Sequence, residues 1–140
     1  MGVNAKKRKR KPSDWRPSVS TLILRDDARS AGYNNVLQAL RRLVKLLGNN
    51  QLGALLGVAK SQPSRWLRGD PIAGENERRI LDLDYVIARA VRVIHSDKIG
   101  AWLTYQVPTL GWARPIDVLA TLGPEAVTRA LDVIEEGALL

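Results

Sequence analysis

The segment from Gly53 to Asp70, GALLGVAKSQPSRWLRGD, constrains the fold more than any other part of the sequence. A short apolar stretch ends at Gly57 and a second short stretch ends at Gly69, which predicts two short helices joined by a tight turn. A chain that only builds a core does not need two short helices so close together. A chain that presents one of them to an anionic partner does, and the second stretch carries three cations, Lys60, Arg65 and Arg68.

Helical periodicity on both sides of this segment predicts an all-α protein. Apolar residues recur at helical spacing over 34–47, where Asn34 or Asn35 can cap the start. A long helix is expected over 75–95, and shorter helices over 99–105, 115–122 and 124–136, the last two beginning at a proline. No segment alternates polar and apolar residues. The expected buried stripe of the long helix is Ile80, Leu83, Ile87, Ala90, Val91 and Ile94.

Charge is distributed unequally along the chain, whose formal net charge is +8. Residues 1–70 hold fifteen Lys or Arg and four Asp or Glu, whereas residues 71–140 hold seven and ten. A basic half followed by a mildly acidic half indicates one part that faces nucleic acid and one part with another role. Residues 1–18 include six consecutive cations and are expected to form a disordered basic arm. The segment 22–31 can be a helix or a short strand.

The composition argues against several classes of function. The absence of Cys excludes disulfide frameworks, thiolate metal sites and cysteine nucleophiles. No apolar run is long enough to span a membrane, and the basic amino-terminal segment lacks the apolar region of a secretory signal. His95 is expected to sit at the end of the long helix as a dipole partner, and Asp82 and Asp84 should point to different sides. We therefore expect no catalytic residues, no metal site and no cofactor.

The opening segment has the spacing of a helix-turn-helix. Counted from the small residue Gly53, a turn glycine follows at +4, an aliphatic residue expected to be buried, Val58, at +5, and an apolar anchor, Trp66, at +13. The run LGALLGVAKSQPSRWLRG resembles the Xre/Cro-type helix-turn-helix repressors, in which position 63 usually carries an apolar β-branched residue instead of Pro63. The resemblance assigns a DNA-binding region to 19–73 and a connecting helix to 74–96.

The same resemblance implies how DNA is bound. The second helix would enter the major groove, with Lys60, Ser61, Gln62, Ser64 and Arg65 near base edges and Arg68 near phosphates. Gln62 can pair with adenine and Arg65 with guanine. Repressors of this type bind two half-sites of an operator, which implies a homodimer. The basic arm would add affinity for phosphates, although in a eukaryotic chain it would resemble a nuclear localisation run. Three further cations either contact phosphates or belong to an ordinary solvated helix face. They are Arg41, Arg42 and Lys45.

Residues 97–140 resemble the toxin-binding domain of the MbcA/ParS/Xre antitoxins. The matching positions are Trp102, Leu103, Pro108, Leu110, Gly111, Arg114, Pro115, Ile116, Leu119, Gly123, Val127, Leu131, Ile134 and Gly137. The chain departs from the pattern at Thr109, where Asn is common, and at Trp112, which is unusual.

The second resemblance implies a cytoplasmic antitoxin of bacterial or phage origin. It would neutralise a toxin of the RES or ADP-ribosyltransferase-like, NAD-consuming type and repress its own operon. Gly137 would free the chain from the last helix, so that the tail plugs the toxin's active site; a frayed carboxyl terminus is the other interpretation. An Xre-like repressor with a dimerisation domain and no toxin is the alternative function. The candidate toxin-binding residues are Trp102, Arg114, Gly137, Ala138, Leu139 and Leu140.

Overall fold

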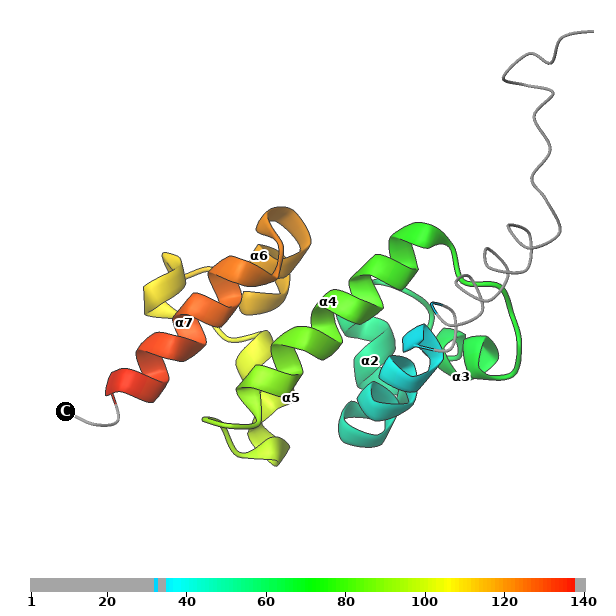
Figure 1. Ribbon diagram of the computed structural model, residues 1–140, viewed down its shortest axis with the longest axis horizontal. Coiled ribbons are helices and arrows are strands. Elements are labelled where there is room, and N and C mark those ends of the chain that lie inside the picture. Colours follow the sequence, from blue (N-terminus) through cyan, green and yellow to red (C-terminus); the bar gives the residue numbers. More distant parts are fainter. Residues whose placement is uncertain (1–31, 33–34, 138–140) are drawn as a thin grey trace, which may run out of the picture. The chain divides into compact units, whose positions relative to one another are not determined.

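A computed structural model describes residue 32 and residues 35–137, and the secondary-structure elements in that part of the chain are helices. The expectation of an all-α fold is confirmed there (Figure 1). Residues from Asn35 onward belong to one compact unit. The expected basic arm, the undecided segment 22–31, the capping residue Asn34 and the expected plug residues Ala138, Leu139 and Leu140 lie outside the described residues.

The first three helices follow one another closely. A helix over 35–47 ends before Gly48, whose φ of 80° lies in the left-handed region. Helix α2 (Asn49–Leu56) then begins at once, because one glycine is enough to redirect the chain. After a turn comes α3 (Gln62–Leu67). The buried apolar side chains of these helices are Val36, Ala39, Leu40, Leu43, Leu52, Leu56 and Trp66.

The long helix α4 (Gly74–Ala90) is shorter than the pattern predicts. Backbone N–H groups of Arg92 and Val93 donate to the carbonyls three residues earlier, so the chain tightens into turns after Ala90 instead of continuing the helix. The expected buried stripe is therefore wrong at its end, since Val91 is 49% exposed and Ile94 is half-buried.

His95 consequently lies outside α4, and its expected role as a helix-dipole partner is wrong. Its side chain is exposed, and its Nδ1 lies 3.3 Å from a carboxylate oxygen of Asp97. The two aspartates of α4 do point to different sides, as expected: Asp82 pairs with Arg78 and Asp84 pairs with Arg42.

The remaining helices form the carboxyl-terminal part of the unit. The 3-10 helix η2 (Ser96–Lys98) leads into α5 (Ile99–Leu103), and the 3-10 helix η3 (Pro108–Leu110) precedes α6 (Pro115–Leu122) and α7 (Pro124–Gly137). Both long helices of this part begin at the predicted prolines. Gly137 is the last residue of α7, so the helix extends one residue further than expected and Gly137 does not itself leave it.

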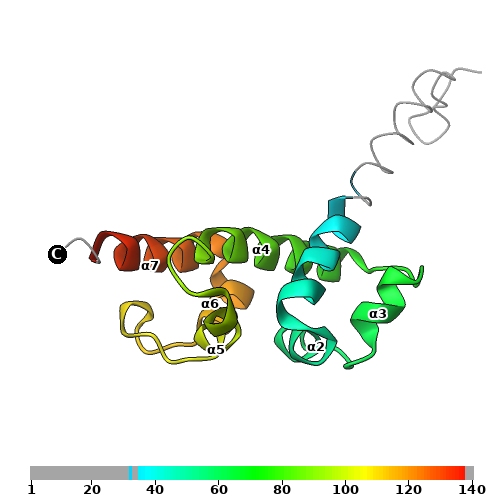
Figure 2. The same ribbon diagram turned by 90° about the horizontal axis from the view of Figure 1, so that it is seen from below.

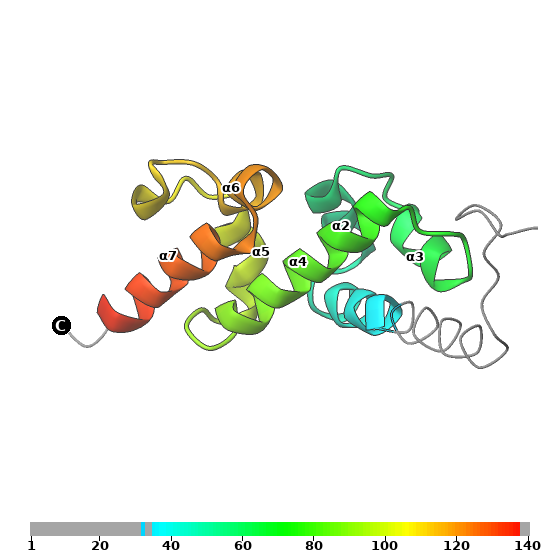
Figure 3. The same ribbon diagram turned by 45° about the horizontal axis from the view of Figure 1, so that its top comes forward.

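Helix α4 contacts helices from both halves of the sequence. It packs against α2 on the amino-terminal side and against α6 and α7 on the carboxyl-terminal side, and Figures 2 and 3 show α7 running beside α4. Two ion pairs link α4 and the turn after it to α7, Arg89 with Asp132 and Arg92 with Glu135. The buried side chains Ile80, Leu83, Val86 and Ile87 of α4 thus belong to a core that both halves share.

Candidate functional site

The turn between α2 and α3 is built on two glycines. Gly53 is buried in α2, and a Cβ atom placed on it would lie 2.9 Å from the carbonyl oxygen of Ala59 and 3.2 Å from Cα of Lys60. Gly57 adopts the left-handed conformation, with φ 71° and ψ 30°, and caps α2. The backbone N–H of Val58 then donates to the Gly53 carbonyl at 2.9 Å. The turn backbone therefore lies directly on α2, as the spacing predicts.

Helix α3 is fixed by the residues on its inner side. Trp66 is 2% exposed and Pro63 is fully buried, so proline occupies the apolar position at which the repressor pattern has a β-branched residue. Val58 is only half-buried, so the expectation of a buried aliphatic is correct only in part. Ser61 makes no side-chain cap, and instead its carbonyl accepts a hydrogen bond from Oγ of Ser64 at 3.0 Å.

The outer side of α3 and the turn before it carries the predicted DNA-binding residues. Lys60, Ser61, Arg65 and Arg68 are exposed, and Gln62 and Ser64 are half-buried. In the part of the chain that the structure describes, none of the three cations forms an ion pair. Their charges are therefore not neutralised by carboxylates within the described fold.

Of the three further cations on the 35–47 helix, Arg42 is already engaged. Its Nε and Nη2 donate to the two carboxylate oxygens of Asp84 at 3.1 and 2.8 Å, and these hydrogen bonds raise the pKa of Arg42 above its ordinary value. Arg41 and Lys45 are exposed and make no ion pair among the described residues. Arg42 therefore joins the first helix to α4, which leaves Arg41 and Lys45 as the freer cations of this face.

The predicted toxin-binding residues are spread over the carboxyl-terminal helices. Trp102 of α5 is half-buried, Gly137 is exposed at the end of α7, and Arg114 is exposed immediately before α6. The structure does not bring these three residues together: Arg114 lines a cleft between α2, α4 and α6, and Trp102 and Gly137 do not. Their proposed common role therefore depends on a partner large enough to contact several helices.

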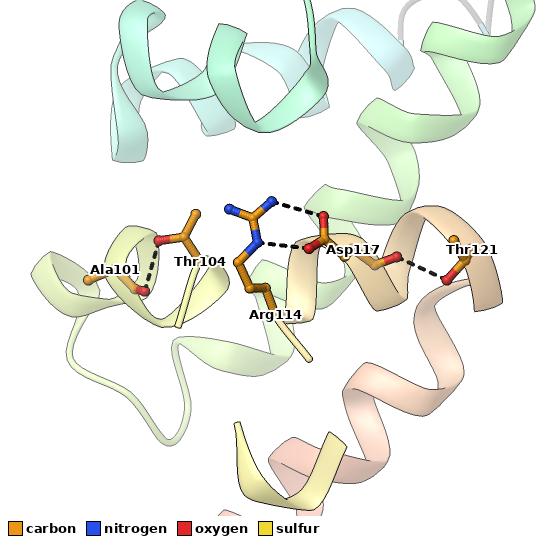
Figure 4. A network of polar contacts seen from close by, with 5 residues as sticks. All are labelled: Ala101, Thr104, Arg114, Asp117 and Thr121. Atoms are coloured by element: carbon orange, nitrogen blue, oxygen red, sulfur yellow. Dashed lines mark hydrogen bonds and ion pairs between the residues drawn. The ribbon is translucent and has the colours of Figure 1, made fainter. Parts of the chain in front are cut away.

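Arg114 forms a closed pair with Asp117 at the start of α6 (Figure 4). Its Nε and Nη2 donate to the carboxylate at 2.7 and 3.0 Å, which lowers the pKa of Asp117 below 3.8 and raises that of Arg114. Thr121 donates to the Asp117 carbonyl one turn later at 3.0 Å. Arg114 thus offers a partner a hydrogen-bonded pair and not an isolated positive charge.

A cleft of about 500 Å³ between α2, α4 and α6 was not foreseen from the sequence. Its three cations are already paired within the fold: Arg78 with Asp82 at 3.5 Å, Arg79 with Glu75 at 2.7 Å, and Arg114 with Asp117 at 2.7 Å. Arg79 also donates to the carbonyl of Leu56 at 3.3 Å. The rim is therefore neutralised by its own neighbours. The apolar lining consists of Ala54, Leu55, Leu56, Leu83, Ile116, Leu119 and Ala120.

Two further searches of the described residues gave negative results. No group of three or more His, Cys, Asp or Glu side chains is placed to hold a metal ion within residues 35–137. Among the described helices, none combines the length and the apolar character needed to cross a membrane.

Comparison with known proteins identifies one informative likeness in structure. The sequence matches no protein-family model, and no match was found among curated proteins. The structure is similar to a chain in the crystal structure of the M. tuberculosis MbcT–MbcA toxin–antitoxin complex, with a TM-score of 0.61 and 20% sequence identity. The likeness is one of fold. It covers 74% of this chain and 96% of that chain, so almost the whole of the other chain has a counterpart here.

Proposed function

We propose that this protein is the antitoxin of a type II toxin–antitoxin pair, and that it binds both operator DNA and a protein toxin. The observation that carries the proposal is the likeness in fold to a chain of a toxin–antitoxin complex, since it extends over 96% of that chain. The sequence resemblances described above support the same function independently, because they fall in the expected order along the chain.

The DNA-binding part of the proposal rests on α2, α3 and the turn between them. The close approach at Gly53, the left-handed Gly57 and the buried Trp66 set α3 firmly against α2. The exposed cation Lys60 lies in the turn before α3, and the exposed Arg65 is the fourth residue of α3, a helix that a major groove can accept. Two copies on adjacent half-sites would double the contacts, so we propose that the antitoxin binds its operator as a homodimer and represses its own operon.

The toxin-binding part rests on the carboxyl-terminal helices and the tail that follows Gly137. By the family resemblance, the toxin is of the RES or ADP-ribosyltransferase-like, NAD-consuming type. Exposed Arg114 and half-buried Trp102 contribute to the contact surface. The three apolar residues after Gly137 enter the toxin's active-site cleft, where desolvated apolar anchors contribute most of the binding energy.

The test of the toxin proposal is co-expression with the protein encoded by the adjacent gene. The full chain should co-purify with that protein and restore growth, whereas a chain that ends at Gly137 should lose neutralisation. The truncated chain should still bind the operator, and its free energy of unfolding should change by no more than about 0.5 kcal/mol. If the full chain binds the operator but never binds the adjacent product, the alternative of a repressor without a toxin is correct.

The test of the DNA proposal is Arg65→Ala in the full chain. Its affinity for the operator should fall by about 1–3 kcal/mol while its affinity for random DNA changes little, if Arg65 contacts a base edge. The same variant should still restore growth in the presence of the toxin, which makes it the matched control for the truncated chain. Equal losses on operator and random DNA would reduce Arg65 to a phosphate contact.

A further inference from the structure

Helices α4 and α7 form one layer of the unit. Figure 2 shows them in line, with α2, α5 and α6 all on the same side of that layer. The ion pairs Arg89–Asp132 and Arg92–Glu135 lie about one turn apart along both parts of the chain, so α4 and α7 run in the same direction. The two helices therefore turn their outer sides toward solvent together, on the side away from α2, α5 and α6.

The outer side of this layer carries exposed apolar side chains from both helices. On α4, Leu81 is 41% exposed and Tyr85 is 53% exposed, and Ala88 continues their stripe at helical spacing. On α7, Val133 is 50% exposed. Interfaces between identical subunits are more apolar than the rest of a protein surface. We define the α4/α7 face as the exposed residues Leu81, Tyr85, Ala88, Arg129, Val133 and Glu136.

Two opposite charges of the α4/α7 face make no ion pair in the part of the chain that the structure describes. Arg129 lies about one turn before Val133 on α7, and Glu136 lies about one turn after it. Glu125 stands at the spacing of an intrahelical pair with Arg129, but that pair is not formed. The outer stripe of α7 therefore has one positive and one negative charge on either side of an apolar residue.

This order of charges is complementary to itself. When two copies of α7 pack antiparallel with Val133 against Val133, positions before this residue in one copy face positions after it in the other. Arg129 lies about 6 Å from Val133 along the helix axis and Glu136 about 4.5 Å, so each Arg129 meets Glu136 of the second copy. A two-fold contact requires this reciprocity, and a contact with a different protein does not. With one unpaired charge of each sign, the stripe does not suit nucleic acid, which binds cationic surfaces.

We infer that the α4/α7 face joins two copies of this chain, with Val133 near the two-fold axis and a reciprocal Arg129–Glu136 pair on each side of it. The outer residues of α4 extend the contact beside α7. This inference rests on the homodimer of the proposed function and gives that dimer a surface. The predicted DNA-binding cations belong to α3 and the turn before it, so none of them is used in this contact.

The experiment reverses one charge at a time in the full chain and measures self-association by sedimentation equilibrium, without DNA or toxin. In Arg129→Glu and in Glu136→Arg, two ion pairs of the dimer are lost and two like-charge contacts replace them. Each of these four changes is worth a factor of about 2–3 at an exposed site, so the dissociation constant of the dimer should rise about 30-fold. Lys98→Glu is the control, because Lys98 is an exposed cation of η2 outside the face. It should dimerise as the wild type does.

A mixture of the two single variants separates charge complementarity from damage to the fold. A dimer of one Arg129→Glu copy and one Glu136→Arg copy has opposite charges at both contacts again. The equimolar mixture should therefore dimerise about as tightly as the wild type, and so should the double variant that carries both reversals in one chain. Mixing would not rescue a chain that had failed to fold. If neither the mixture nor the double variant dimerises, the inference is wrong.

The remaining outcomes distinguish this inference from the proposed function. If the single variants dimerise as tightly as the wild type, only the inference about this face fails; if they also lose affinity for the product of the adjacent gene, the toxin covers the face instead. If the wild-type chain is a monomer both free and on the operator, the proposed homodimer fails and the inference fails with it. If the mixture restores the dimer but the wild type binds neither the operator nor the adjacent product, the dimer surface stands and the proposed antitoxin function is wrong.

Discussion

Gly53→Ala tests whether the close contact between α2 and the following turn sets the position of α3. Replacement of glycine by alanine in a helix interior raises the free energy of unfolding by up to about 1 kcal/mol when nothing is in the way. Here, however, the new Cβ atom would lie 2.9 Å from the carbonyl oxygen of Ala59 and 3.2 Å from Cα of Lys60, and both are backbone atoms. Overpacking of this kind costs about 1–3 kcal/mol, so we expect a net loss of about 1 kcal/mol. For a domain of about 100 residues, that corresponds to a fall in Tm of about 4–8 °C.

The assay combines thermal unfolding with operator binding and includes a matched glycine. Gly74→Ala places a methyl group at the first residue of α4, where nothing lies within 4 Å, and should leave Tm unchanged or slightly higher. Gly53→Ala should also weaken operator binding, because the turn must move and α3 moves with it. If Gly53→Ala unfolds at or above the wild-type Tm, the turn backbone accommodates the added methyl group without strain, and the steric argument is wrong.

Three other substitutions test individual contacts. Trp66→Ala should lower the free energy of unfolding by about 3–5 kcal/mol in urea titrations, because the indole is 2% exposed; a loss below 1 kcal/mol would contradict its role as anchor. A double-mutant cycle on Arg42 and Asp84 should give a coupling energy of at most about 1 kcal/mol that shrinks with salt, because the Arg42 side chain is 61% exposed. The pKa of Asp117 is held below 3.8 by Arg114, so its small stabilising effect is present at higher pH and is lost as the pH falls through that lowered pKa. In Arg114→Gln, an NMR titration should show the Asp117 pKa rising toward 3.8; an unchanged value would mean that the pair does not persist in solution.

The sequence predicted those features that depend on a few neighbouring residues. Gly57 must be left-handed for the chain to turn within so few residues, and Gly53 must lack a side chain for the turn to lie on α2. Pro115 and Pro124 begin helices because a proline in the first turn loses no hydrogen bond. The all-α class followed from apolar periodicity alone, which is a strong signal in helices of this length.

The end of α4 and the ion pairs could not be predicted in the same way. Val91 and Ile94 continue the apolar period of α4, yet the chain tightens into turns after Ala90. Apolar periodicity does not show where a hydrogen-bond pattern changes from i+4 to i+3. The pairing of Arg42 with Asp84 joins residues 42 positions apart, so it exists only once the helices have packed. The cleft between α2, α4 and α6 depends on the same packing.

The two proposed binding surfaces share one core, which determines how they can be tested. Helix α4 packs against α2 on one side and α7 on the other, and Gln51 of α2 lies against Gly100 of α5, where an added Cβ atom would meet the amide at 2.4 Å. Removal of the carboxyl-terminal helices would uncover Val86 and Ile87 of α4 and so destabilise the helix on which α2 rests. Loss of operator binding in such a half-chain would therefore say nothing about DNA contacts. Point variants at exposed positions of the full chain, such as Arg65 and Arg114, separate the two activities because they leave this core intact.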